Sequence, residues 1–526
     1  MFDSLTLPLL MLLALGGAVV APLLGGRAVS RLFTMGVMLV ILALTVQLFL
    51  AFGADTPASR YTFDLPWMPS LGVSLRFGVD GVNIYLLLLT ALLFPVVLAC
   101  AWNSREAASG LYLSLLLALQ AGLLGTFAAQ NLVVLFVLWE AVLIPMVLLI
   151  LVYGGDKRRA AAMTFFLYTM AGSVLFLAAV ILLGFASQQQ TGHWAFDFDT
   201  LYRLKLSHGQ QLFVFFSLAL ACAVKSPLFP FHSWLPLAYG EASTTGTALM
   251  AGVLSKMGAF GFIKLVIPLA PEVASQMAPA MVGLAVVSIL YGAVLALRQT
   301  HYKQLVAYAS LSHMGYIVLG VFSFQHTAIQ GAMFQILSHG LSVAGLFLLL
   351  GLLEQRCGPA WLQLDDLATR TPRLAVVMML FVLASLALPL TSGFTAEFLI
   401  LLGAFTQGLA ALRADAGAGL LIAALFASTG VVLGATYMLR FARALVFGDA
   451  GPAAGRAALP DLGAREGLAM APLLALILLI GVWPAPLMHK VEPAVAHLAA
   501  LGSSGQPAKL QAAPRTAAAA VVKVGP

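Results

Sequence analysis

The chain is poor in charged residues. Only 9% of its 526 residues are charged, whereas an average soluble domain carries roughly 25%. A soluble protein of this size needs much more polar surface to face water. Hydrophobic residues make up 61% of the chain, which indicates lipid as the surrounding solvent. We interpret the chain as an all-α polytopic membrane protein.

The chain also lacks the motifs of redox centres and nucleotide sites. Its three cysteines, Cys100, Cys222 and Cys357, are scattered, and no CxxC or Cys/His spacing predicts an iron–sulfur or zinc site. There is no GxGxxG after a strand and no GxxxxGK[ST], so neither dinucleotide binding nor ATP hydrolysis is indicated. We expect no metal and no cofactor in this chain. The net charge of +7 lies in short loops without interleaved aromatics, which argues against nucleic-acid binding.

Apolar runs fill most of the sequence. A bilayer span needs ~20 mostly apolar residues, and we expect about fourteen spans, of which the seventh and twelfth are interrupted. Their ranges are 5–25, 31–52, 82–102, 110–129, 131–153, 161–186, 210–239, 242–268, 277–297, 303–323, 327–353, 373–404, 416–446 and 468–488. The alternating segment 60–80 predicts an extramembrane hairpin. The Ala/Gly/Pro/Ser-rich segment from about 491 predicts a tail that is loosely ordered or lies along the surface.

The loops differ in their content of lysine and arginine. Basic residues are concentrated in the loops that follow odd-numbered spans, for example at Lys157, Arg158 and Arg159. Basic loops usually stay in the cytoplasm. We therefore expect both termini on the periplasmic side. The N-terminal segment has no basic region before its apolar run, so it predicts a first span and not a cleaved signal.

Six ionisable residues remain inside the predicted spans: Glu140, Lys225, Lys256, His313, His339 and Glu397. A charge at a span centre costs about 2.5 kcal/mol or more, so such residues normally face a bundle interior or a hydrated path. Their side chains can exchange protons when burial and charged neighbours adjust their proton affinity. Two structural alternatives stay open. Glu140 and Lys225 could form an inert ion pair, and the two histidines could be satisfied core residues.

The two interrupted spans share one design. Lys225 precedes Pro227 and Pro230, and Pro389 precedes Glu397. Paired broken helices in corresponding halves indicate an inverted-repeat transporter with its site near the midplane. A broken helix frees backbone groups, which is tolerable only beside water or protein. We expect Lys225 at the hinge of a hydrated half-channel. Proline kinks that serve packing alone are the alternative.

Seven motifs in this order resemble those of a known family. They are WEAVLIPM, VYGGDKRRAAAMTFFLYTMAGSVLF, VKSPLFPFHSWLP, AGVLSKMGAFGF, YASLSHMGY, FQILSHGLSVAGLF and SGFTAEFLILLGAF. The chain from about 75 to 450 is similar to the antiporter-like subunits of respiratory complex I. Glu397 favours the M-type subunits, because relatives more often carry lysine in that broken helix. Leu237 departs from the family, where Asp is usual, and SPLFP replaces a more common MP pair.

The resemblance implies fourteen transmembrane helices with two inverted five-helix repeats. It divides the chain into helices 1–3 with the hairpin (1–108), a first repeat (109–268), a second repeat (269–446), a last helix (447–490) and a flexible tail (491–526). By motif, Glu140 and Lys225 would form a coupling pair and Lys256 a central relay. His313 and His339 would link towards the second half, and Glu397 would be the exit or connecting group.

The resemblance also implies a function. The chain would be a proton-translocating, non-redox subunit of NADH-quinone oxidoreductase in the bacterial inner (cytoplasmic) membrane. Its partners would be other membrane subunits and a peripheral arm that carries FMN and iron–sulfur clusters, and quinone would be reduced elsewhere in the complex. A subunit of a multisubunit cation/proton antiporter or of a membrane-bound hydrogenase-type complex is the alternative in the same superfamily. A structural membrane scaffold with inert charges is the alternative from another class.

Overall fold

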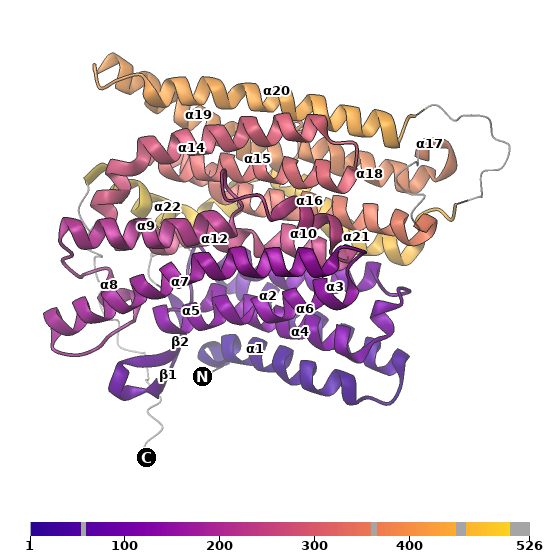
Figure 1. Cartoon of the computed structure of the whole chain (residues 1–526), viewed down its shortest axis with the longest axis horizontal. Helices are drawn as coiled ribbons and strands as arrows, with labels where there is room; N and C mark the ends of the chain where they lie inside the picture. The colour runs from indigo at the N-terminus through magenta and orange to yellow at the C-terminus, as the bar shows by residue number, and fades with distance from the viewer. Residues whose placement is uncertain (1, 54–58, 359–365, 449–458, 505–526) are drawn as a thin grey trace.

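A computed structural model describes residues 2–53, 59–358, 366–448 and 459–504, and its helices run side by side in one bundle (Figure 1). Within these ranges, twelve helical stretches are long and apolar enough to cross a membrane. Two shorter apolar helices, α3 (Ile84–Cys100) and α18 (Pro372–Ser385), lie among them. The chain is a multi-pass helical membrane protein. The count of fourteen spans and the inverted repeats stay predictions.

The first part of the chain forms eight helices and one hairpin. The helices are α1 (Phe2–Val20), α2 (Arg27–Ala51), α3, α4 (Gly110–Ala128), α5 (Leu132–Ala141), α6 (Leu143–Tyr153), α7 (Arg158–Thr191) and α8 (Phe198–Leu201). Strand β1 (Arg60–Met68) pairs antiparallel with β2 (Val73–Val79), with Arg60 opposite Val79 and Met68 opposite Val73. The hairpin predicted at 60–80 is therefore confirmed. Figure 1 places it, α8 and the start of α1 at the same end of the bundle.

The remaining chain is helical between its loops. Its α-helices are α9 (His208–Lys225), α10 (Leu235–Glu241), α11 (Thr244–Leu249), α12 (Lys256–Gly261), α13 (Ile267–Leu269), α14 (Pro271–Arg298), α15 (Tyr302–Phe322), α16 (His326–Cys357), α17 (Leu367–Arg370), α18, α19 (Ser392–Arg413), α20 (Gly419–Leu445), α21 (Ala464–Val482) and α22 (Ala485–Ser504). Two π-helical segments, Met250–Leu254 and Phe262–Val266, lie on either side of α12. Such segments are rare and are frequent at functional sites.

The sequence predicts two helix breaks, and the structure has both of them and a third. α9 ends at Lys225 and α10 begins at Leu235, and α18 and α19 are separated in the same way. The third break, at Val142, divides the span predicted at 131–153 into α5 and α6. Pro145 explains it, because proline has no N–H to donate to the carbonyl four residues earlier. The break follows Glu140 by two residues.

The centre of the bundle is formed by three long stretches. α16 and α15 are almost wholly buried, and so is the stretch Thr244–Leu269 that runs from α11 to α13. α20 is instead largely exposed and forms one flank of the bundle, at the top of Figure 1. Large apolar side chains such as Leu425 and Val432 point outward from it. Exposed apolar side chains are expected on a helix that faces lipid. Polar residues of the three central stretches are instead buried within the protein, away from both lipid and water.

The prediction of a loosely ordered tail from about 491 is wrong for residues 491–504. α22 continues to Ser504, and the segment from 505 lies outside the described residues. The helix is amphipathic, because Val491, Val495 and Leu498 are buried at the spacing of one helix face. Lys490 also donates from Nζ to the carbonyl of Phe52 at 2.6 Å. Composition alone misled the prediction, since Ala-rich sequence with regular apolar positions favours a helix.

A distant carboxylate caps the N-terminus of α18. Asp461 accepts hydrogen bonds from the backbone N–H groups of Arg373 and Leu374, both at 3.0 Å, and from that of Leu462 at 2.7 Å. Burial raises the pKa of Asp461, but these three donors lower it, and the net pKa lies below the ordinary value. The cap ties the loop before α21 to the helix that precedes the second break.

Replacing this cap should destabilise the protein. In Asp461→Ala, the first turn of α18 loses its acceptors, and a lost cap typically costs about 1 kcal/mol. Thermal unfolding of the purified protein should occur at lower temperature than in wild type, and the difference should shrink as the pH falls through the lowered pKa of Asp461. The matched control is Asp156→Ala, on an exposed loop residue. Equal stability of the two variants at neutral pH would contradict the capping role.

Candidate functional site

Four of the six predicted site residues form one chain of neighbouring side chains in the buried centre, made of two hydrogen-bonded pairs that meet at the two histidine rings. The Lys256 Nζ lies 2.7 Å from His339 Nδ1, and the rings of His339 and His313 are 5.3 Å apart between centroids. His313 Nδ1 then lies 2.9 Å from Glu397 Oε1. Each residue comes from a different helix, namely α12, α16, α15 and α19. The structure therefore brings together side chains that are 141 positions apart in the sequence, from 256 to 397.

The lysine end of this chain is fully enclosed. Lys256 has no exposed surface, and its ammonium group also donates to Ser255 Oγ at 3.1 Å and to the carbonyl of Ala251. That carbonyl belongs to the π-helical segment before α12. A π-helical turn shifts the usual backbone pairing, which makes a carbonyl available to a side chain. The local irregularity thus gives the buried ammonium group an acceptor.

The glutamate end is held by two donors. Glu397 Oε1 accepts from Gln335 Nε2 at 3.0 Å in addition to its contact with His313. Gln335 lies one turn before His339 on α16, so one helix serves both ends of the histidine pair. Ser338 and Ser392 make a further hydroxyl contact of 2.7 Å between α16 and α19. These contacts fix the start of α19 directly after the second break.

Lys225 lies apart from this chain, at the last residue of α9. It is buried, and its Nζ has no hydrogen-bond partner among the described residues. The ammonium group lies 5.5 Å from the centroid of the Trp139 ring, in a cation–π geometry. The C-terminal end of a helix also favours a positive charge. Both features stabilise the cation without supplying a hydrogen bond.

Glu140 is the neighbouring acid of Lys225, but the two are not an ion pair in this structure. Their charges are close enough to interact, yet no N···O contact within 4.0 Å joins them in the described part of the chain. One carboxylate oxygen of Glu140 is buried without a hydrogen-bond partner. The alternative of an inert Glu140–Lys225 ion pair therefore does not describe this conformation, and the coupling pair that the resemblance implies stays a prediction.

The first break is partly closed by protein groups. The Trp234 indole donates to the carbonyl of Val224 at 3.1 Å, and the N–H of Phe229 donates to Ser288 Oγ at 3.1 Å. α12 packs closely on the end of α9, because a Cβ at Gly258 would lie 2.2 Å from Ser226 Oγ. Ser226 Oγ also donates to the carbonyl of Ser255 at 3.4 Å. Ser226, directly after Lys225, thus contacts Ser255, directly before Lys256.

Three ionisable residues near the ends of the predicted spans have structural contacts. Lys264 forms a buried ion pair with Asp80 at 2.5 Å, which joins the second π-helical segment to the turn between β2 and α3. Glu241 accepts from the backbone N–H of Lys157 at 2.8 Å. The His232 ring packs against Phe229 and Tyr291.

Sequence reasoning missed Trp139 and Trp234 as site residues. An aromatic residue in an apolar run carries no polar signal, so neither differs from an ordinary core residue in the sequence. Ser255 was missed for a similar reason, since small hydroxyl residues are common in membrane helices. The position of Trp139 directly before Glu140 was the available hint. Arrangement in space, and not residue type, identifies all three.

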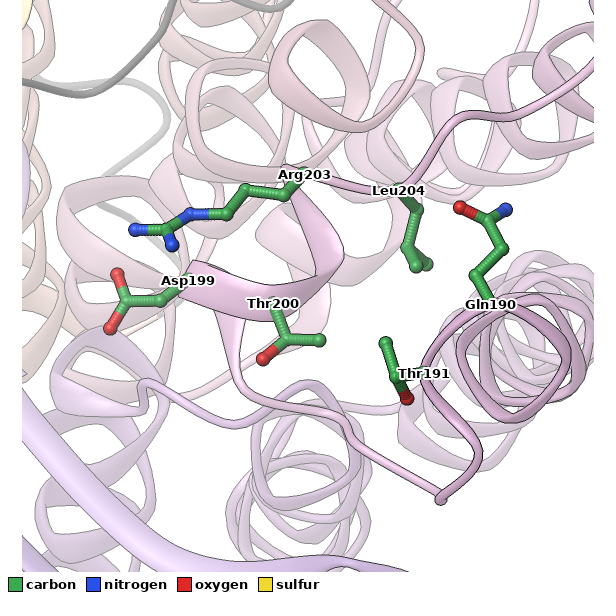
Figure 2. A pocket seen from close by; sticks show the side chains of 6 residues that line it. All are labelled: Gln190, Thr191, Asp199, Thr200, Arg203 and Leu204. Atoms are coloured by element: carbon green, nitrogen blue, oxygen red, sulfur yellow. The ribbon is translucent and has the colours of Figure 1, made fainter.

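A pocket lies at the hairpin end of the bundle, away from the six predicted site residues. Its volume is about 310 Å³, and Figure 2 shows Asp199 and Arg203 on one side of it and Gln190 and Thr191 on the other. Asp199 is already paired with Arg76 at 2.8 Å. Both polar groups of the Gln190 amide are bonded to the backbone of Lys205. Across the described ranges, no group of three or more His, Cys, Asp or Glu side chains is arranged to hold a metal ion.

Comparisons with known proteins agree on the family. A family profile described as "NADH:quinone oxidoreductase/Mrp antiporter, TM" matches residues 129–414. The NADH-quinone oxidoreductase subunit M of Rickettsia typhi is 35% identical over 460 residues, which covers 86% of this chain and 89% of that protein. The matched region contains all six predicted site residues.

Two solved structures have the same fold. A chain of respiratory complex I from Thermus thermophilus with bound NADH superposes with a TM-score of 0.82 and 33% identity, over 95% of this chain and 99% of that one. A chain of the Mrp complex from Dietzia sp. superposes with a TM-score of 0.80 at 24% identity, over 95% of this chain and 98% of that one, and shows the fold alone. The chain belongs to the NADH:quinone oxidoreductase/Mrp antiporter family, with the M subunits of NADH-quinone oxidoreductase among its relatives.

Proposed function

We propose that this chain is a proton-translocating membrane subunit of an NADH-quinone oxidoreductase. The observation that carries the proposal is the buried chain from Lys256 through His339 and His313 to Glu397. Three of its members sit in the three most buried stretches of the bundle, and Glu397 is itself buried on α19; an ionisable group in such a place is expensive unless it has a role. Family membership supports the same conclusion, since the relatives are named as subunits of that oxidoreductase.

The chemistry of the four groups suits proton transfer. A lysine and a glutamate each exist in two protonation states, and an imidazole can take a proton at one nitrogen while it releases one from the other. The Lys256–His339 and His313–Glu397 contacts are within hydrogen-bond distance, so a proton can pass along either of them without movement of the helices. The step between the two histidine rings requires a rotation or a bridging water, which makes it the step most open to control.

Glu140 and Lys225 would load this chain. Lys225 lacks a hydrogen-bond acceptor in this conformation, and the nearby Glu140 is not in direct contact with it. A small movement at the break in Val142 or at the break after Lys225 would change their separation. Because a nearby carboxylate stabilises the ammonium form, this separation sets how readily Lys225 releases its proton. The two breaks flanking the pair are the elements that can move.

Two inverted repeats would divide the site residues into two groups. If the first repeat spans 109–268 and the second 269–446, then Lys225 and Lys256 belong to the first and the histidines and Glu397 to the second. The contact between Lys256 and His339 would then be the connection between the two halves.

The function requires partner subunits. Electron transfer from NADH to quinone needs FMN, iron–sulfur clusters and a quinone site, which we place in other subunits of the complex.

A subunit of a cation/proton antiporter assembly is the second candidate function, because the family profile includes Mrp antiporters. Glu397 favours the oxidoreductase. Purification of the chain with its native partners would separate the two, since the first yields flavin and iron–sulfur proteins and the second does not.

The variant Lys225→Arg tests whether Lys225 carries protons or only supplies a fixed positive charge. Arginine keeps the positive charge beside Trp139 and Glu140 but does not release its proton in proteins. In vesicles that contain the purified complex, NADH-driven proton uptake should fall by about 100-fold in Lys225→Arg, the low end of what a positioned acid–base group contributes. The complex should retain its subunit composition. Lys205→Arg, on an exposed loop residue, is the control and should leave uptake unchanged.

The scaffold interpretation predicts the opposite result for this variant. If Lys225 only neutralises a charge, arginine at this position should support proton uptake close to that of wild type. Lys225→Ala provides the second arm, because it removes the charge altogether. Wild-type uptake in both variants, with normal assembly, would show that the lysine has no part in transport.

Both termini should lie on the periplasmic side of the membrane. The loops that follow odd-numbered spans are rich in lysine and arginine, and such loops usually lie in the cytoplasm. The start of α1 and the β1–β2 hairpin lie at one end of the bundle (Figure 1), so the hairpin should be periplasmic as well. A single cysteine introduced at Ser70, in the hairpin turn, should react in intact spheroplasts with a maleimide that does not cross membranes. A cysteine at Asp156, in a basic loop, should react only after lysis. The reverse pattern would invert the topology.

A further inference from the structure

A small cavity lies beside Glu397 and is also lined by its neighbour His313. It is bounded by α15, by the break between α18 and α19, and by the flank helix α20. Its lining includes His313, Ser385, Glu397, Gly434 and Tyr437. Its volume is about 10 Å³, which is close to the least that holds one water molecule. The cavity therefore has room for one water and no more.

Several polar atoms around this cavity lack a protein partner. Both recorded hydrogen bonds of Glu397 go to Oε1, so Oε2 has none among the described residues. The same holds for the Tyr437 hydroxyl, although Tyr437 is 1% exposed and lines the same cavity as Glu397. The hydroxyl of Ser385 has no protein partner in the described ranges either. By contrast, the Tyr316 hydroxyl is committed to the carbonyl of Ala427 at 2.8 Å.

We propose that this cavity is a one-water site, in which Tyr437 and Ser385 hold a water against Glu397 Oε2. A buried water normally makes two to four hydrogen bonds to polar groups that would otherwise be unsatisfied, and these three groups meet that requirement. The presence of the water does not depend on the proposed function, but its role in proton transfer rests on that function. If Glu397 is a proton carrier, the water gives its second oxygen a transfer partner beyond His313.

The position of the water defines a route that the four-residue chain lacks. Oε1 of Glu397 faces His313 and Gln335, so a proton that arrives from His313 reaches that oxygen. If Glu397 already carries a proton on Oε2, arrival of a second proton at Oε1 would allow the water to accept the proton from Oε2, which leaves the carboxyl group with one proton. The other contacts of the water are on the break and on α20, which forms the exposed flank of the bundle. Tyr437 would thus be a positioning residue, because it acts on Glu397 through the water.

The backbone offers a precise way to fill the site. A Cβ at Gly434 would have Tyr437 Oη as its nearest neighbour, at 3.7 Å, which is ordinary van der Waals contact. Gly434→Ala should therefore place a methyl group in the cavity without displacing protein atoms. Gly419→Ala, on the same helix, is the matched control, because the added methyl group would meet open space. Tyr437→Phe removes one of the three polar partners and leaves the ring in place.

The test is an electron-microscopy map of the purified complex at a resolution that shows ordered interior waters. The wild-type and Gly419→Ala maps should contain a water peak within hydrogen-bond distance of Glu397 Oε2 and Tyr437 Oη. Gly434→Ala should lose this peak. Absence of the peak in wild type, where waters elsewhere in the interior are visible, would overturn the proposal. So would a peak that persists in Gly434→Ala.

Infrared difference spectra give a readout that a structural role for Tyr437 would not produce. The carboxyl band that disappears in Glu397→Gln belongs to Glu397, and it should shift in Tyr437→Phe and Gly434→Ala but not in Gly419→Ala. An unchanged band in both test variants would contradict the site. Failure of the proposed function looks different, because the water peak would be present while Glu397→Gln still transports protons at the wild-type rate.

Discussion

An ionisable side chain in the hydrocarbon layer has to be compensated by nearby dipoles, hydrogen bonds or opposite charges. Six such side chains lie in the predicted spans, and the architecture around them follows from this requirement. Lys256 is compensated by a carbonyl of a π-helical segment, by Ser255 and by His339. Glu397 is compensated by His313 and Gln335. Among these partners, His339 and His313 are themselves ionisable, and they connect the buried lysine to the buried glutamate.

The helix breaks are a consequence of the same requirement. A continuous helix uses all of its interior backbone groups on itself, so it has none left for a buried charge. The breaks after Lys225 and before α19, together with the π-helical turns beside Lys256, release carbonyls and N–H groups at the depth where the charges lie. Where no charge uses them, protein groups do, as when Trp234 donates to Val224. Breaks of this kind also permit movement, which a proton pump needs and a static scaffold does not.

Much of the fold could be predicted from the sequence, because its signals are local. Long apolar runs define membrane helices, and Pro227 and Pro389 mark breaks through the missing N–H and the fixed ring. The hairpin was predictable from alternation at 60–80. The break at Val142 was missed although Pro145 produces it, because apolar residues on both sides conceal it. α22 was missed because its alanine and glycine content hid the regular spacing of Val491, Val495 and Leu498.

The candidate residues could be named from the sequence, but their connections could not. A charge in an apolar run is visible in the sequence, whereas the contact of Lys256 with His339 joins positions 83 residues apart. The coupling pair of Glu140 and Lys225 was expected from the motifs, and in the structure Glu140 Oε1 and Lys225 Nζ are buried without a hydrogen-bond partner. Tyr437 carried no signal, since a tyrosine near the end of an apolar helix is common at membrane interfaces.

The most direct measurement of the central claim is proton uptake by vesicles that contain the complex with Glu397→Gln. Glutamine is nearly the same size as glutamate and can still bond to Gln335 and His313, but it does not carry a proton. The account predicts that the variant assembles with its partners and that NADH-driven uptake falls to background, while the exposed control Glu272→Gln transports protons as wild type does. Uptake at the wild-type rate in Glu397→Gln would contradict the account.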